Sequence, residues 1–173
     1  TTTDTPSLVQ NLEVEKISRD EALLAEDRID FENENIKGSI SLVGAHIDDL
    51  TFKKYTETLN GKDNVILLNP KKSENGYYIE TGWASGGNQN LKVPLNNTIW
   101  KVKGNTFLSP NNPITFEWDN GEGLIFTKKI DLDDKFLFKI TQTIKNNSNN
   151  SYQFFPYAQI TRNYKPEVTP IYI

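Results

Sequence analysis

The stretch that decides the fold runs from residue 114 to residue 130 and reads ITFEWDNGEGLIFTKKI. Its two outer parts, residues 114–118 and 124–130, are rich in β-branched and aromatic residues, which favour strands. In the second part, Leu124, Phe126 and Ile130 lie on one side of an extended chain. Between the two parts, Asp119-Asn120-Gly121 tolerates the positive φ that a tight turn requires. The stretch therefore predicts a β-hairpin.

Short apolar runs with turn residues between them continue on both sides of this hairpin. They cover residues 36–43, 47–52, 65–68, 77–83 and 98–102 before it, and residues 136–140 and 152–160 after it. Phe136, Phe138 and Ile140 alternate with Leu137 and Lys139, and residues 146–150 form a polar turn. No internal repeat of fixed period is present. This spacing is typical of an all-β protein and predicts an antiparallel sandwich with long strands.

One helix is expected, over residues 18–27. Ser18-Arg19-Asp20-Glu21 has the form of a capping box, and Ala22 to Ala25 continue it with good helix formers. Before it, residues 8–17 are a weak candidate for a first strand. We therefore expect an N-terminal segment, residues 1–27, that carries the helix, followed by a β-domain over residues 28–173.

Composition excludes several classes of function. The 173 residues carry a net charge of −4, which argues against nucleic acids and anionic membrane surfaces as partners. Cysteine is absent and His46 is the single histidine, so thiol chemistry and the common zinc sites are excluded, and no metal or cofactor is expected. No apolar run reaches 18 residues. Methionine is absent even at position 1, so we interpret the chain as an excised or processed piece of a longer protein.

His46 is the first candidate for chemistry because it is alone. A general base needs an orienting carboxylate, and Asp48 and Asp49 are near in sequence. We favour the simpler interpretation, a residue of the turn that follows Gly44 and Ala45. A nucleophile elbow requires glycine two positions before its serine, and Trp83 stands two positions before Ser85. A glycine-rich loop is therefore expected there.

Two further clusters have a functional and a structural interpretation. Asp131, Asp133 and Asp134 lack the glycine and the glutamate of a calcium loop, which favours a solvated turn. An aromatic platform for sugar rings is the alternative to a core role for the five ring-bearing residues Tyr77, Tyr78, Trp83, Trp100 and Trp118, and we favour the core. Paired carboxylates for glycoside hydrolysis stay open, because such pairs form in space and not in sequence.

Several of these segments resemble one family. Residues 38–50, GSISLVGAHIDDL, are similar to a stretch of the large periplasmic domain of the bacterial membrane protein insertase YidC, in its alphaproteobacterial form. The similarity continues through KYTET at 54–58, LLNP at 67–70, YYIETGW at 77–83 and VPLNNTIW at 93–100. It ends with WDNGEGLIF at 118–126 and PYAQITR at 156–162, and it covers residues 28–173. His46 stands where the family commonly has arginine.

The resemblance implies an antiparallel β-supersandwich like that of galactose mutarotase, with the family domain continuing beyond residue 173. It also implies a place at the periplasmic face of the bacterial inner membrane, anchored by helices outside this chain. YidC proteins insert and fold inner-membrane proteins, alone or with the Sec translocon. The implied partners are the translocon accessory subunits SecD and SecF and nascent inner-membrane proteins, met by the full-length protein.

We therefore expect a non-catalytic interaction module, with a carbohydrate-binding or aldose-epimerase-like protein as the alternative. Strand edges are the expected docking sites in a sandwich. Two lysine-bearing segments, Lys101 to Lys103 and Lys128-Lys129, are interpreted as edges protected against promiscuous pairing. The expected docking edge lies elsewhere, on one side of the last strand, and consists of Tyr152, Phe154, Pro156, Ala158 and Ile160.

Overall fold

A computed structural model describes residues 16–86 and 91–165 as one helix and eleven strands. The elements are α1 (Arg19–Leu24), β1 (Arg28–Glu32), β2 (Ile36–Ser41), β3 (Ile47–Thr56), β4 (Asn64–Leu68), β5 (Tyr77–Ser85), β6 (Lys101–Lys103), β7 (Phe107–Leu108), β8 (Ile114–Asp119), β9 (Leu124–Leu132), β10 (Phe138–Asn146) and β11 (Phe154–Arg162). Within these residues, no helix has the length and apolar character needed to cross a membrane. The all-β class with one short N-terminal helix is confirmed.

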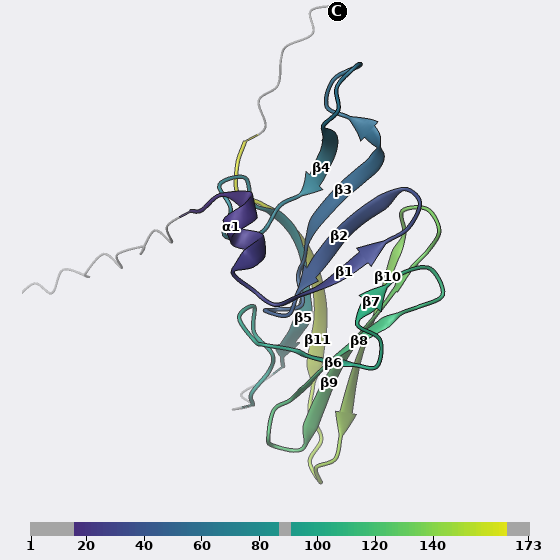
Figure 1. The fold of residues 1–173 in the computed structure, drawn as a ribbon. Coiled ribbons are helices and arrows are strands. Elements are labelled where there is room, and N and C mark those ends of the chain that lie inside the picture. Colours follow the sequence, from purple (N-terminus) through teal and green to yellow (C-terminus); the bar gives the residue numbers. More distant parts are fainter. Residues whose placement is uncertain (1–15, 87–90, 166–173) are drawn as a thin grey trace, which may run out of the picture.

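The strands form two sheets (Figure 1). The larger has the order β11-β5-β3-β2-β1-β7, with β4 paired to β3, and the smaller has the order β10-β9-β8-β6. Their pairings are antiparallel except for β1 with the short β7, which is parallel. The last two strands of the chain are both edge strands: β10 ends the smaller sheet and β11 ends the larger one.

The hairpin predicted from residues 114–130 is confirmed as β8 and β9, which pair from Ile114 opposite Ile130 to Asp119 opposite Ile125. The turn is held by Asn120, whose Oδ1 accepts hydrogen bonds from the backbone N–H groups of Glu122 and Leu124 at 2.8 and 3.0 Å. Gly121 adopts a φ of 72°, the left-handed conformation that costs glycine little.

The core lies between the sheets and is mainly aromatic and β-branched. Trp83 of β5 packs against Phe126 of β9 with ring centroids 5.2 Å apart, and Phe31 of β1 packs against Phe138 of β10 at 5.1 Å. Trp100 stacks on Trp83 and is almost fully buried. The core interpretation is therefore confirmed for Trp83 and Trp100.

The capping box is confirmed, but the helix is shorter than expected. The Ser18 hydroxyl accepts from the Glu21 N–H, while the Glu21 carboxylate accepts from the Ser18 N–H at 3.0 Å. The helix ends at Leu24 and not at residue 27, since residues 28–32 already belong to β1. The weak strand over residues 8–17 lies almost wholly outside the described residues.

Two expectations about strands are wrong. Phe136 and Leu137 lie in the turn before β10 and are exposed, because the Asp133 carboxylate binds the backbone N–H groups of Lys135 and Leu137 and closes the turn there. Lys128 and Lys129 do not lie on an edge, because β9 is paired on both sides. Lys101 to Lys103 do form an edge strand, β6.

Candidate functional site

A cavity of about 960 Å³ lies on the outer side of the larger sheet. Residues of α1, of the β4–β5 loop and of the loop before β6 surround it, while His46, Asp48 and Tyr78 contribute from β3 and β5 or next to them. Cavities of this size are the usual place for a ligand in a protein. This cavity is therefore the first candidate site.

His46 and Glu80 meet beside the cavity. His46 directly precedes β3 and Glu80 lies on β5. These strands pair antiparallel with Ile47 opposite Ile79, so the neighbours His46 and Glu80 also come together. His46 Nε2 lies 3.1 Å from Glu80 Oε1, and both side chains are buried. His46 follows the turn at Gly44 and Ala45, as expected, but it does have a carboxylate partner, and that partner is neither Asp48 nor Asp49.

Both oxygens of the Glu80 carboxylate have partners. Its Oε2 accepts a hydrogen bond of 2.6 Å from Gln159 Nε2 on β11, and its Oε1 also lies 3.6 Å from Lys71 Nζ. Burial lowers the pKa of His46 to about 4, although the charge of Glu80 acts in the opposite direction. His46 is thus a neutral imidazole at pH 7. Because a carboxylate only accepts, Nε2 carries the proton.

Lys128 lies directly behind this pair. It extends from β9 across the interface between the sheets, and its Nζ donates to the carbonyl oxygens of Thr81 and Gly44 at 2.6 and 3.1 Å. The ammonium also lies 4.8 Å from the ring centroid of Trp100. Burial lowers the pKa of Lys128 to about 8, and the Glu80 carboxylate opposes that shift. Lys128 therefore ties the two sheets together as a buried cation.

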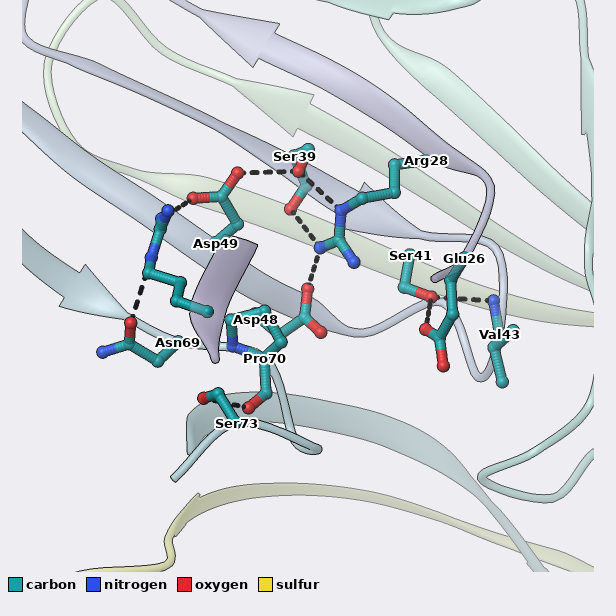
Figure 2. Close-up of polar contacts among 11 residues, drawn as sticks. Glu26, Arg28, Ser39, Ser41, Val43, Asp48, Asp49, Asn69, Pro70 and Ser73 are labelled. Atoms are coloured by element: carbon teal, nitrogen blue, oxygen red, sulfur yellow. Dashed lines mark hydrogen bonds and ion pairs between the residues drawn. The ribbon is translucent and has the colours of Figure 1, made fainter. Parts of the chain in front are cut away.

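Asp48 and Asp49 are paired with arginines (Figure 2). Asp48 binds Arg28, whose Nε also donates to Ser39 Oγ at 2.7 Å, and both charged side chains are buried. Asp49 binds Arg19 of the helix and accepts from Ser39 Oγ at 2.7 Å. Burial raises the pKa of Asp48 to about 6, which the Arg28 guanidinium opposes. These carboxylates hold α1 to the sheet and link β1 to β3 within it, and they do not orient His46.

The other sequence candidates separate in space. Ser85 ends β5, and Asp133 closes the turn before β10, so the solvated-turn interpretation is confirmed there. Asp131 lies within β9 and pairs with Lys129 at 3.2 Å. Of the five aromatic residues, Tyr78 reaches the cavity, while Trp118 packs on Phe126 in the core with centroids 5.6 Å apart. No aromatic platform forms among the described residues.

The pKa of His46 predicts a pH-dependent stability. Unfolded histidine titrates near pH 6.5, so His46 contributes stability that is complete above that pH and is lost as the pH falls toward 4. Between pH 7 and pH 4.5, we expect the wild-type chain to lose about 2 kcal/mol more free energy of unfolding than His46→Gln. Urea titrations at both values measure this. Asp48 shifts the free energy of unfolding in the opposite direction, but it is present in both proteins and its effect cancels in the comparison. Equal pH dependence of the free energy of unfolding in the wild-type chain and His46→Gln would contradict the prediction.

Comparison with known proteins identifies the family. The model of the family described as the YidC periplasmic domain matches residues 28–172. The chain belongs to the YidC periplasmic domain family. The resemblance seen in the sequence motifs is thereby confirmed.

Curated relatives agree with this assignment. The membrane protein insertase YidC of Pelagibacter ubique (strain HTCC1062) is 49% identical over 170 residues, which are 98% of this chain and 30% of the relative. The YidC of Jannaschia sp. (strain CCS1) is 39% identical over 146 residues, 84% of this chain and 23% of the relative. That of Methylorubrum extorquens (strain PA1) is 37% identical over 158 residues, 91% of this chain and 25% of the relative. The chain thus spans less than a third of these YidC proteins.

Proposed function

We propose that this chain is the periplasmic part of a membrane protein insertase and acts there as a non-catalytic interaction module. In this proposal, the full-length protein lies in the bacterial inner membrane, held by helices outside this chain, and inserts and folds nascent inner-membrane proteins. The domain contacts the translocon accessory subunits SecD and SecF from the periplasmic face. The names of the relatives support the insertase activity.

The observation that carries the interaction role is the free edge of β11. This strand has nine residues, pairs with β5 along its whole length on one side and has no partner on the other side among the described residues. Three large apolar side chains are exposed on it: Phe155 at 54%, Tyr157 at 40% and Ile160 at 66%. An unpaired edge with apolar side chains on both faces is a template for an incoming strand.

One face of β11 divides into a packed part and an exposed part. Phe154 packs on Phe126 with centroids 5.7 Å apart, and Tyr152 packs against the same core, so both anchor the strand. Pro156, Ala158 and Ile160 follow on the same face and are exposed. We therefore propose the half of the edge from Pro156 to Ile160 as the docking site, with Tyr152 and Phe154 as its support.

Such docking need not be strong. A domain tethered beside a membrane complex meets its partners at a high effective concentration, so weak contacts still occupy the interface. Pro156 has no N–H to donate, which limits the registers in which a foreign strand can pair and so favours a specific partner.

Photo-crosslinking in cells tests this proposal. In the full-length protein, a benzophenone amino acid at Ala158 or Ile160 is expected to form adducts with SecD or SecF. The matched control positions are Lys101 and Lys103, which lie on the edge strand of the other sheet. Adducts from the control positions alone, from neither edge, or only with another segment of the insertase itself would reject β11 as the docking edge.

A carbohydrate-active protein is the second candidate, because mutarotase-type chemistry uses a histidine acid with a glutamate base. His46 and Glu80 do lie 3.1 Å apart. His46 Nε2 and Glu80 Oε1 contact each other directly, however, and Glu80 Oε2 accepts from Gln159, so there is no space for a sugar between the two groups. The geometry therefore favours the non-catalytic role.

Polarimetry decides between these two candidates. We expect the wild-type chain and His46→Ala to leave the anomer interconversion of glucose at the rate of buffer alone. Acceleration by the wild-type chain that disappears in His46→Ala would show that the domain is an enzyme.

A further inference from the structure

The proposed interaction at the β11 edge leaves the cavity beside His46 without a function. Its wall is largely apolar, with Ala22, Val43 and Pro70 among its residues, and polar groups enter it from several segments. Lys16 approaches from before α1, and Lys71 and Lys72 approach from the β4–β5 loop. The ligand that suits the cavity depends on which of these polar groups already have hydrogen-bond or ion-pair partners within the protein.

The carboxylates around the cavity are all bonded within the protein. Asp48 is paired with Arg28. Glu26 accepts from Ser41 Oγ at 2.5 Å and lies 2.9 Å from Lys72 Nζ, and Glu80 is bonded as described above. The carboxylates of the wall therefore already have partners within the protein, so they repel a bound anion less than free carboxylates would.

Lys72 is engaged by Glu26, but within the described residues the other two ammonium groups keep most of their N–H groups unused. Each ammonium has three N–H groups. In residues 16–86 and 91–165, Lys16 Nζ has one long hydrogen bond, 3.5 Å to the Glu74 carbonyl oxygen, and Lys71 Nζ has one ion pair, 3.6 Å to Glu80. Asn96 and Asn97 also line the cavity and are exposed.

The charges of the side chains around the cavity also favour an anion. Three lysines and two carboxylates line the cavity, and Arg28 behind the wall adds a cation at Asp48, while Lys128 and Glu80 cancel. The wall is therefore positive within a chain whose net charge is −4. Lysine ammonium groups that converge from separate segments suit an anion with oxygens on several sides better than a planar carboxylate.

We propose that this cavity binds a phosphate-type anion, either free phosphate or the phosphate of a lipid headgroup. Lys16, Lys71 and Lys72 would supply the charge and Asn96 and Asn97 further N–H donors. The apolar part of the wall would receive whatever the phosphate carries. Asn163, which follows β11, lines the cavity, but no residue of the proposed docking half from Pro156 to Ile160 does. The site can therefore be tested independently of the proposed function.

Calorimetric titration of the 173-residue chain in phosphate-free buffer of low ionic strength tests the site. Three probes are used: inorganic phosphate, dihexanoyl phosphatidylglycerol below its critical micelle concentration, and glucose. We expect a phosphate probe to bind with a dissociation constant of about 1 mM or tighter, and added salt to weaken the binding. Tighter binding of the lipid would assign the headgroup, and binding of inorganic phosphate alone would assign the free ion. Binding of glucose alone, or of no probe, would overturn the proposal.

Matched charge variants locate the binding. The triple variant Lys16→Gln, Lys71→Gln, Lys72→Gln is expected to weaken phosphate binding at least about tenfold. The control, Lys101→Gln, Lys139→Gln, Lys145→Gln, loses the same charge from exposed positions on β6 and β10 and is expected to change it less than about twofold. Equal losses in both would mean that only net charge matters and would overturn the site. Should the triple variant not fold, Lys16→Gln alone, at an exposed residue, is expected to weaken binding about twofold or more, and no change would count against the site.

Discussion

Arg28→Ala is expected to lower the free energy of unfolding by about 3–5 kcal/mol at pH 7, because it leaves a buried carboxylate without its cation. The side chains of Arg28 and Asp48 are only 9% and 3% exposed. Arg28 also donates to the Ser39 hydroxyl, so its loss removes a hydrogen bond between β1 and β2 as well. The pairing thus connects three neighbouring strands, β1, β2 and β3.

The effect should depend on pH in a definite direction. Burial already raises the pKa of Asp48 to about 6 even with Arg28 present, and removal of the guanidinium raises that pKa further. As the pH falls through this range, Asp48 takes up a proton and the unpaired charge disappears. The destabilisation by Arg28→Ala should therefore be smaller at pH 5 than at pH 7.

Urea denaturation at both pH values measures this, with Lys53→Ala as the control. Lys53 pairs with Glu32 at 2.6 Å, but those side chains are 32% and 47% exposed, so the control should cost at most about 1 kcal/mol. A loss for Arg28→Ala no larger than that of the control, or equal losses at pH 5 and pH 7, would contradict the account of the buried pair.

Phe126→Ala is expected to cost about 3–5 kcal/mol, the usual range for a phenylalanine removed from a packed core. Phe126 is 0% exposed and contacts three aromatic rings from three other strands or their ends: Trp83, Trp118 and Phe154. Because Phe154 anchors β11, the cavity left by Phe126→Ala should also loosen the proposed docking edge. Faster amide hydrogen exchange along β11 would report this.

Phe136→Ala is the matched control, since it removes the same side chain from a position that is 48% exposed. It should change the free energy of unfolding by no more than about 1 kcal/mol. Midpoints of urea denaturation, compared at unchanged slope, separate the two variants. Similar midpoints would mean that the aromatic cluster around Phe126 is not the centre of the core.

Those parts of the fold that depend on neighbours in sequence were predictable. The β8–β9 hairpin follows from Asn120 and Gly121, because the amide side chain and the positive φ act within four residues. The start of α1 follows from Ser18 and Glu21 for the same reason. The end of α1 was less predictable, because pairing of β1 with β2 draws residues from Arg28 onward into the sheet.

The burial of Lys128 was indicated by the period-2 pattern of its strand, but the residue was interpreted otherwise from the sequence. In β9, the alternate residues Leu124, Phe126, Lys128, Ile130 and Leu132 are all buried. The period-2 pattern therefore places the Lys128 side chain on the core face, where a lysine must find acceptors, and only Lys129 faces outward. The pair was interpreted as a protected edge because lysine commonly protects strand edges against promiscuous pairing.

The sequence by itself determined the β class, the hairpin, the helix cap and the family motifs, because these depend on short segments of chain. Only the tertiary structure decided that His46 meets Glu80, since β3, which begins directly after His46, becomes the neighbour of β5 through the pairing of Ile47 with Ile79. Likewise, Asp48 and Asp49 are bound by Arg28 and Arg19, which approach from β1 and α1. Charges far apart in sequence shift one another's pKa only when the sheet brings them within a few ångströms, and strand order is a property of the whole chain.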